Sequence, residues 1–289
     1  MTVALAATLQ FEAPAEAARV LAWWSDHLSD PSGGFFGEID AKDIPVPGAD
    51  KSVILNTRLL WYFSAMARQS ASVSALAMAH RANTYLRAHF VDAASGGVFW
   101  QVDCQGKVTD GKKQAYAQAF AIYALTEYYL ASQAADALRL ACELQDMVEA
   151  RYWDAATGGY IEALDRNWQP LADLRLSEKD LDAPKTMNTH LHVLEAYTLL
   201  HRVVDTDKTQ QRLERTLSLF LERFVGADGH VRLFFDMDWT DRTRSVSFGH
   251  DIEASWLIWE AAEVLGDPGL CARARPAVLA LARTTLHEG

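Results

Sequence analysis

One loop pattern occurs four times along this chain and constrains its fold more than any other feature. Residues 33–40, 96–103, 158–165 and 229–236 each begin with glycine, carry aromatic or aliphatic residues and end with aspartate. We number them loop 1 to loop 4; they begin 63, 62 and 71 residues apart. Such a repeat holds two helices and a turn, and a helix pair cannot bury its apolar face alone. The sequence therefore predicts helical hairpins stacked side by side, as a solenoid or a closed ring.

Charge and cysteine content narrow the function class. The 289 residues carry a formal net charge of −11 with a pI near 5.3, which argues against a phosphate-backbone partner, so we expect no nucleic acid. The sequence holds no run of 18 apolar residues, so we expect no membrane span. Cys104, Cys142 and Cys271 are odd in number and widely spaced, which is typical of reduced thiols in a cytoplasmic protein. No linker divides the repeats, so we expect residues 1–289 to form one domain.

The segments between the loops have helical periodicity and helix-forming composition. They predict an all-α protein with nine helices, at residues 12–28, 51–69, 72–90, 112–130, 134–151, 184–203, 208–224, 247–265 and 268–286. Pro14, Pro184 and Pro268 stand where first-turn prolines are favoured. The residues after each loop glycine predict short strands that cross one end of the helices. We expect the long non-helical segment 158–183 to lie over one mouth of the ring.

Polar side chains gather in the first two turns of the four helices predicted to begin near 51, 112, 184 and 247. We expect these four to form the inner wall of a ring and the others its outer wall. One end of the ring would then collect Asn56, Arg58, Gln114, Tyr116, Asn188, His192, His250 and Glu253. The N-termini of the inner helices converge there too, and their partial positive charge favours an anion.

Two histidines stand beside polar partners. Asn188 and His192 are four residues apart, and His250 and Glu253 are three apart, so each pair shares a helix face. A histidine with a carboxylate one turn away is the pattern of a general base; the alternative is a core histidine with a satisfied hydrogen bond. Two such pairs at equivalent places in successive repeats favour the general base.

Several other residues leave two interpretations open. Arg58 lies in an apolar segment, where an unpaired charge is costly to bury. It either bridges to an acid inside the ring or reaches a cavity and binds an oxyanion or hydroxyl groups. Tyr116 is either a core aromatic or a binding residue. Trp61, Trp100 and Trp239 are candidate platforms for a sugar ring.

Other chemistries are disfavoured. His190 and His192 are two residues apart and point to different sides of a helix, so we expect no metal site and interpret His190 as structural. There is neither a phosphate-binding glycine loop nor a GxSxG nucleophile, so acyl chemistry is disfavoured. We interpret two basic pairs as solvated surface: Lys112/Lys113 and Arg242/Arg244.

Three segments resemble a known family. They are residues 50–61 (DKSVILNTRLLW), 185–197 (KTMNTHLHVLEAY) and 249–257 (GHDIEASWL). They resemble signatures of the N-acylglucosamine 2-epimerase superfamily, particularly of its cellobiose 2-epimerase branch. The resemblance covers essentially the whole chain.

The resemblance implies an (α/α)6 barrel of twelve helices with the site in its central cavity. It implies an isomerase that inverts C2 of a reducing-end sugar, in a mono- or disaccharide, without a cofactor. His250 would be the catalytic acid/base, Glu253 the carboxylate that supports it, and His192 would assist ring opening or hold a substrate oxygen. The implied substrate-binding residues are Arg58, Tyr116 and Asn188.

The family also places a second catalytic histidine on late inner helices, which would follow Gly289. With nine of twelve helices present, we expect a barrel truncated after Gly289 and therefore weak or absent turnover. An open end exposes apolar faces, so we expect association with a partner, of which a homodimer is one form.

Three alternatives stand beside the epimerase. One is an aldose–ketose isomerase of mannose/fructose type on the same fold, and another is a non-catalytic sugar-binding barrel. A glycoside hydrolase would need two opposed carboxylates, and only Glu253 stands out.

Overall fold

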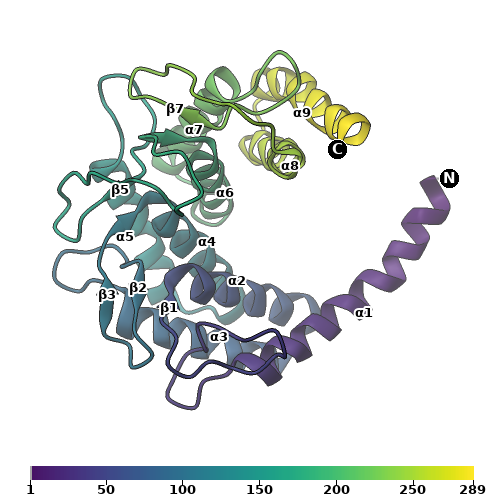
Figure 1. Cartoon of the computed structure of the whole chain (residues 1–289). Coiled ribbons are helices and arrows are strands. Elements are labelled where there is room, and N and C mark those ends of the chain that lie inside the picture. Colours follow the sequence, from purple (N-terminus) through teal and green to yellow (C-terminus); the bar gives the residue numbers. More distant parts are fainter. Residues whose placement is uncertain (1) are drawn as a thin grey trace.

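The chain folds into an arc of helical hairpins (Figure 1). The computed structural model describes the backbone of residues 2–289 and the side chains of residues 12–289. The described part has nine α-helices, and a π-helical turn, Leu86–Phe90, extends the third. They are α1 Thr2–Leu28, α2 Val53–Ser70, α3 Val73–Tyr85, α4 Ala115–Ser132, α5 Ala135–Arg151, α6 Met187–Val204, α7 Asp207–Arg223, α8 Phe248–Leu265 and α9 Pro268–Glu288. The nine predicted helices are confirmed.

The predicted helix starts were less accurate than the helices themselves. The first helix begins at Thr2 rather than at residue 12, because its early residues are good helix formers. Pro14 therefore lies inside α1 and not in its first turn. Pro184 is not in a first turn either, because it precedes the start of α6 at Met187. Pro268 occupies the first turn of α9, as predicted.

Four helices form the inner layer and four the outer layer. Helix α2 packs on α4, α4 on α6 and α6 on α8, while α3, α5, α7 and α9 each pack behind the inner helix that precedes them. Helix α4 is apolar nearly all round because its neighbours cover it on three sides. This is the alternating arrangement predicted for an α/α barrel. Helices α1 and α9 lie at the two ends of the arc in Figure 1.

Short antiparallel strands cross one end of the helices, as predicted. They are β1 Lys51–Ser52, β2 Gln101–Val102, β3 Val108–Asp110, β4 Lys113–Gln114, β5 Ala163–Leu164, β6 Lys185–Thr186 and β7 Phe234–Phe235. The residues that lead into α2, α4 and α6 pair with strands of loops 2, 3 and 4, respectively. Each loop is thereby fixed to the start of the inner helix before it.

A buried lysine holds each of the first three loops. The three side-chain pairs are Lys51–Asp30 (2.6 Å), Lys113–Asp92 (2.8 Å) and Lys185–Asp154 (2.8 Å). The prediction that Lys113 is solvated surface is wrong, because its side chain is fully buried. Its ammonium group also contacts the Gly96 carbonyl oxygen and lies 4.2 Å from the centre of the Trp168 ring. The pair and the ring offset the cost of burying the charge.

Glycine is required at the second position of loops 1 to 3. There the backbone has positive φ, and an aromatic ring lies against it. A Cβ atom on Gly97 would stand 2.8 Å from the Trp168 ring, and one on Gly159 would stand 2.6 Å from the Trp239 ring. Each of these tryptophans belongs to the turn that follows the next loop, so successive loops interlock.

Loop 4 is built differently. Gly226 and Val246 stand where loops 1 to 3 have aspartate and lysine, and His230 replaces the second glycine. The ring of His230 contacts Asp251 of α8 (Nδ1 to Oδ2, 2.8 Å), and the same carboxylate accepts the backbone N–H of Val231. The hydrogen bond with Asp251 raises the pKa of His230.

Equivalent residues of the inner helices α4 and α6 hold loops 2 and 3. Gln118 of α4 accepts the N–H of Val98, and His190 of α6 accepts the N–H of Tyr160 at Nε2 (2.8 Å). The Nδ1 proton of His190 is then donated to the Thr186 carbonyl oxygen. Burial lowers the pKa of His190 to about 3, so the ring stays neutral. The prediction that His190 is structural is confirmed.

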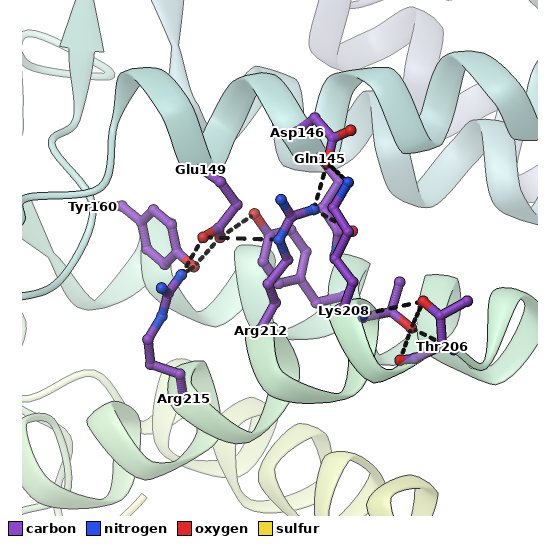
Figure 2. Close-up of polar contacts among 10 residues, drawn as sticks. Gln145, Asp146, Glu149, Tyr160, Thr206, Lys208, Arg212 and Arg215 are labelled. Carbon is purple, nitrogen blue, oxygen red and sulfur yellow. Dashed lines mark hydrogen bonds and ion pairs between the residues drawn. The ribbon is translucent and has the colours of Figure 1, made fainter.

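A polar network joins three helices on the outer side of the arc (Figure 2). The Glu149 carboxylate of α5 accepts hydrogen bonds from the hydroxyl groups of Tyr160 (2.8 Å) and of Tyr197 on α6 (2.9 Å). It also pairs with Arg215 and lies 4.0 Å from Arg212, both on α7. The outer helices α5 and α7 are therefore fixed to the inner helix α6.

Candidate functional site

A cavity of about 390 Å³ lies on the inner face of the arc. It is bounded by α1, α2, α4, α6 and α8, and its wall is mostly aromatic and aliphatic. The lining residues are Trp24, Leu55, Arg58, Leu59, Trp61, Tyr62, Phe120, Tyr123, His192, Glu195, Glu253 and Trp256. An apolar cavity with a few converging polar groups is the usual form of a small-molecule site.

A second, narrower cavity of about 60 Å³ contains two more of the predicted residues, whereas Tyr116 lines neither cavity. Asn188 and His250 line it, together with Glu162 and residues 174–176, 180, 181 and 183 of the long loop. Gln114 fixes this part of the long loop by donating to the carbonyl oxygen of Arg175 (3.0 Å). As predicted, the long segment lies at the mouth where the inner helices begin.

Arg58 does not bridge to an acid. Among the described residues its guanidinium has no carboxylate within ion-pair distance. It donates to the Tyr116 hydroxyl (3.0 Å) and lies 4.4 Å from the centre of the Phe120 ring. Because a guanidinium has five N–H donors, most remain available to the cavity.

His192 is clamped in the cavity wall. Its ring contacts Tyr116 edge-on (5.0 Å between ring centres) and Phe120 at 4.6 Å. Its Nδ1 lies 2.9 Å from Oε2 of Glu195, one turn further along α6, and both side chains are nearly buried. No protein group among residues 12–289 binds its Nε2, which is left to the cavity.

His250 has a different partner. Its Nδ1 lies 2.8 Å from the hydroxyl group of Ser247, the residue that caps α8. Burial lowers the pKa of His250, while the nearby Glu253 carboxylate opposes this shift and His192 adds to it. Glu253 therefore acts on His250 through its charge, and the three side chains form one electrostatic group.

The structure also shows residues that the sequence reasoning missed. Glu195 follows His192 by three residues, the spacing that singled out Glu253 after His250, so the signal was available. Burial, with the Glu195 carboxylate beside it, raises the pKa of Tyr123 well above its usual range. Glu162 is fully buried, and its carboxylate accepts hydrogen bonds from Thr186 and Thr189 at the start of α6. These contacts across the loop have no signal in the local sequence.

The three tryptophans suggested as sugar platforms have separate places. Trp61 lines the larger cavity and stacks on Tyr123 (5.5 Å between ring centres). Trp239 is buried on Gly159 and donates its N–H to Thr157, so it is structural. Trp100 lines neither cavity.

Two further observations concern the described part of the chain. Its side chains form no group of three or more histidines, cysteines or acids that could hold a metal ion. None of its helices is long and apolar enough to cross a membrane.

Known proteins share both the sequence and the fold. Residues 34–287 match the family model described as N-acylglucosamine 2-epimerase. The chain is 46% identical over 266 residues to the cellobiose 2-epimerase of Bacteroides fragilis, covering 91% of this chain and 68% of that protein. The solved cellobiose 2-epimerase of Bacillus thermoamylovorans superposes with a TM-score of 0.88 at 36% identity, over 93% of this chain and 69% of that one. A solved D-mannose isomerase has a TM-score of 0.80 at 18% identity, over 94% and 68% of the two chains, which shows the fold alone. The chain therefore belongs to the N-acylglucosamine 2-epimerase family.

Proposed function

We propose that this chain is a carbohydrate 2-epimerase, which inverts C2 of a reducing-end aldose as in the conversion of cellobiose to glucosyl-mannose. One observation carries the proposal. His192 and His250 come from neighbouring inner helices, and the charges of His192 and Glu253 act on the pKa of His250. His192 and Glu253 line the larger cavity together with Arg58, most of whose donors are uncommitted. The relatives that are 31–46% identical and named cellobiose 2-epimerase support the same chemistry.

The reaction needs proton transfer at three places. A pyranose opens when a proton reaches the ring oxygen and the anomeric hydroxyl loses one. A base then removes the C2 proton, which is acidic because it is α to the aldehyde, and an enediolate forms. Return of a proton to the other face of C2 gives the epimer, and its return to C1 gives a ketose.

His250 suits the step at C2. Burial lowers its pKa, so the ring is neutral and can accept a proton at neutral pH, and the charge of Glu253 stabilises the imidazolium that results. The Ser247 hydroxyl can donate or accept, so it permits either tautomer of a residue that acts in turn as base and acid.

The other predicted residues suit binding and ring opening. We assign proton transfer at the substrate oxygens to His192, whose Nε2 faces the larger cavity. The guanidinium of Arg58 would stabilise the enediolate oxygen, the main electrostatic task of this reaction. Tyr116 and Asn188 would orient hydroxyl groups of the sugar.

Proton NMR of cellobiose incubated with the protein in D2O tests the proposal. We expect slow incorporation of deuterium at C2 and a slow glucose-to-mannose change at the reducing end, in keeping with weak turnover, with both abolished by His250→Asn. A ketose as the sole product would assign the chain to aldose–ketose isomerisation. Exchange that persists unchanged in His250→Asn, or its absence in the folded wild type, would overturn the proposal.

Two further expectations belong to this proposal. Three free cysteines suit a reducing compartment, so we place the protein in the cytoplasm. Association as a homodimer stays a prediction, which sedimentation equilibrium would test.

A further inference from the structure

We propose that Glu195 is a positioning residue that fixes the tautomer and the orientation of His192. Only the kinetic part of this proposal rests on the proposed function. The first observation is geometric: Oε2 of Glu195 lies 2.9 Å from Nδ1 of His192, one turn apart on the rigid helix α6. The exposed fractions of the two side chains are 11% and 6%, so bulk water does not compete for this bond.

The bond determines which ring nitrogen carries the proton. An ionised carboxylate can only accept, so Nδ1 of a neutral His192 must carry the hydrogen. Its Nε2 then presents a lone pair to the cavity. Without the carboxylate the ring could carry its proton on either nitrogen, and the Nε2–H form cannot take a proton from a substrate.

The ring is also held from turning. Tyr116 and Phe120, whose own ring centres are 4.8 Å apart, both contact it, at 5.0 and 4.6 Å between ring centres. Both come from α4, whereas Glu195 comes from α6, so two inner helices fix the ring together. The carboxylate selects the nitrogen that faces the cavity, and the aromatic rings select the plane.

His250 shows what the carboxylate adds. Its Nδ1 meets the Ser247 hydroxyl, which both donates and accepts and therefore leaves the tautomer open. Within one site, His192 is held in one tautomer and His250 can exchange between two. This difference suits a fixed proton acceptor at an oxygen beside a group that alternates between base and acid.

Nitrogen NMR of the histidine rings tests the assignment without any substrate. In protein labelled with 15N-histidine, the signals of His192 are those absent from His192→Gln. We expect a protonated Nδ1 and an unprotonated Nε2 in the wild type. Glu195→Leu should give a mixture of tautomers, and Glu195→Gln should stay closer to the wild type because its amide oxygen can still accept. Identical His192 signals in the wild type and Glu195→Leu would overturn the proposal.

Kinetics supply the second readout. We expect kcat for C2 epimerisation to fall roughly tenfold to a hundredfold in Glu195→Leu and less in Glu195→Gln, with KM changing little. An unchanged kcat in Glu195→Leu would contradict the role. If the wild type does not epimerise sugars, the proposed function fails, and the ring spectra still decide whether Glu195 fixes His192.

Helix α6 supplies a matched control. Asp205 lies 4.0 Å from His201 at the other end of the helix and is largely exposed. The change Asp205→Asn weakens a second histidine–carboxylate pair outside the cavity. It should leave the His192 signals and kcat unchanged; if it shifts both as Glu195→Leu does, the effect is one of helix stability and the proposal falls.

Discussion

Loops 2 and 4 solve the same structural problem with different side chains. In loop 2 a buried lysine pairs with Asp92, and Gln118 binds the backbone of the loop. In loop 4 the single carboxylate of Asp251 binds both the backbone N–H of Val231 and the ring of His230. Both loops keep the same turn. The backbone N–H of Asp92 is donated to the carbonyl oxygen of Gly97, and that of Gly226 to the carbonyl oxygen of His230. In both loops, polar side-chain contacts thus fix the loop to the inner helices, but the residues that make these contacts differ.

The difference matters because the two fastenings respond differently to pH. A lysine–aspartate pair keeps its charges through the neutral range, whereas a histidine loses its charge there. Loop 4 leads into α8, which carries His250 and Glu253. The hydrogen bond that titrates, between His230 and Asp251, is therefore the one beside the proposed catalytic group.

The largest effect is expected from Lys113→Met. It leaves the buried Asp92 carboxylate without its cation, and removing one partner of a buried ion pair costs about 3–5 kcal/mol. Urea unfolding measures the loss. Adding Asp92→Asn should restore most of it; if the double variant is as unstable as the single one, the pair is not what fastens loop 2.

Loop 3 contains a buried acid where loops 2 and 4 have Trp100 and Leu233. Burial raises the pKa of Glu162 to about 8, from 4.5. Between these values the folded protein keeps a proton that the unfolded chain has lost, so stability falls as the pH rises toward 8. The slope is at most about 1.4 kcal/mol per pH unit. Unfolding of Glu162→Gln at several pH values should lack this slope; the same slope in both proteins would exclude Glu162 as its source.

A smaller effect, about 1–2 kcal/mol at pH 5.5, is expected from His230→Asn, which removes a charged hydrogen bond. Because the bond with Asp251 raises the folded pKa, its stabilisation is complete below the ordinary value near 6.5. It is lost as the pH rises through the folded pKa, so the two proteins should differ less at pH 9. Thermal unfolding at both pH values checks this, and a difference independent of pH would contradict it.

Lys112→Ala is the matched control for Lys113 and should have the smallest effect. Lys112 pairs with Asp110 at 3.6 Å near the surface, and such pairs contribute at most about 1 kcal/mol. We expect a change within about 0.5 kcal/mol in urea unfolding. A loss as large as that of Lys113→Met would remove the distinction between the two lysines.

These two lysines also show where sequence reasoning ends. Helical periodicity predicted the inner and outer layers of helices, because the spacing of apolar residues within each helix marks the face that it buries. Nothing local separates Lys112 from Lys113: the burial of Lys113 depends on Asp92 and Trp168, which are distant in sequence. The partner of His192 could be predicted from spacing, since Glu195 is one turn away. The buried state of Glu162 could not, because it arises from contacts across a loop.

The interlocked loops have a consequence for the order of events during synthesis. Gly97 is covered by Trp168 and Gly159 by Trp239, so loops 2 and 3 each receive their cover from a residue about 70–80 positions later in the chain. At roughly 5–20 residues per second, a ribosome needs several seconds to deliver that cover. Loops 2 and 3 therefore emerge with their glycine turns uncovered and are completed only by the turn after the next loop, so that this part of the assembly proceeds in one direction along the nascent chain.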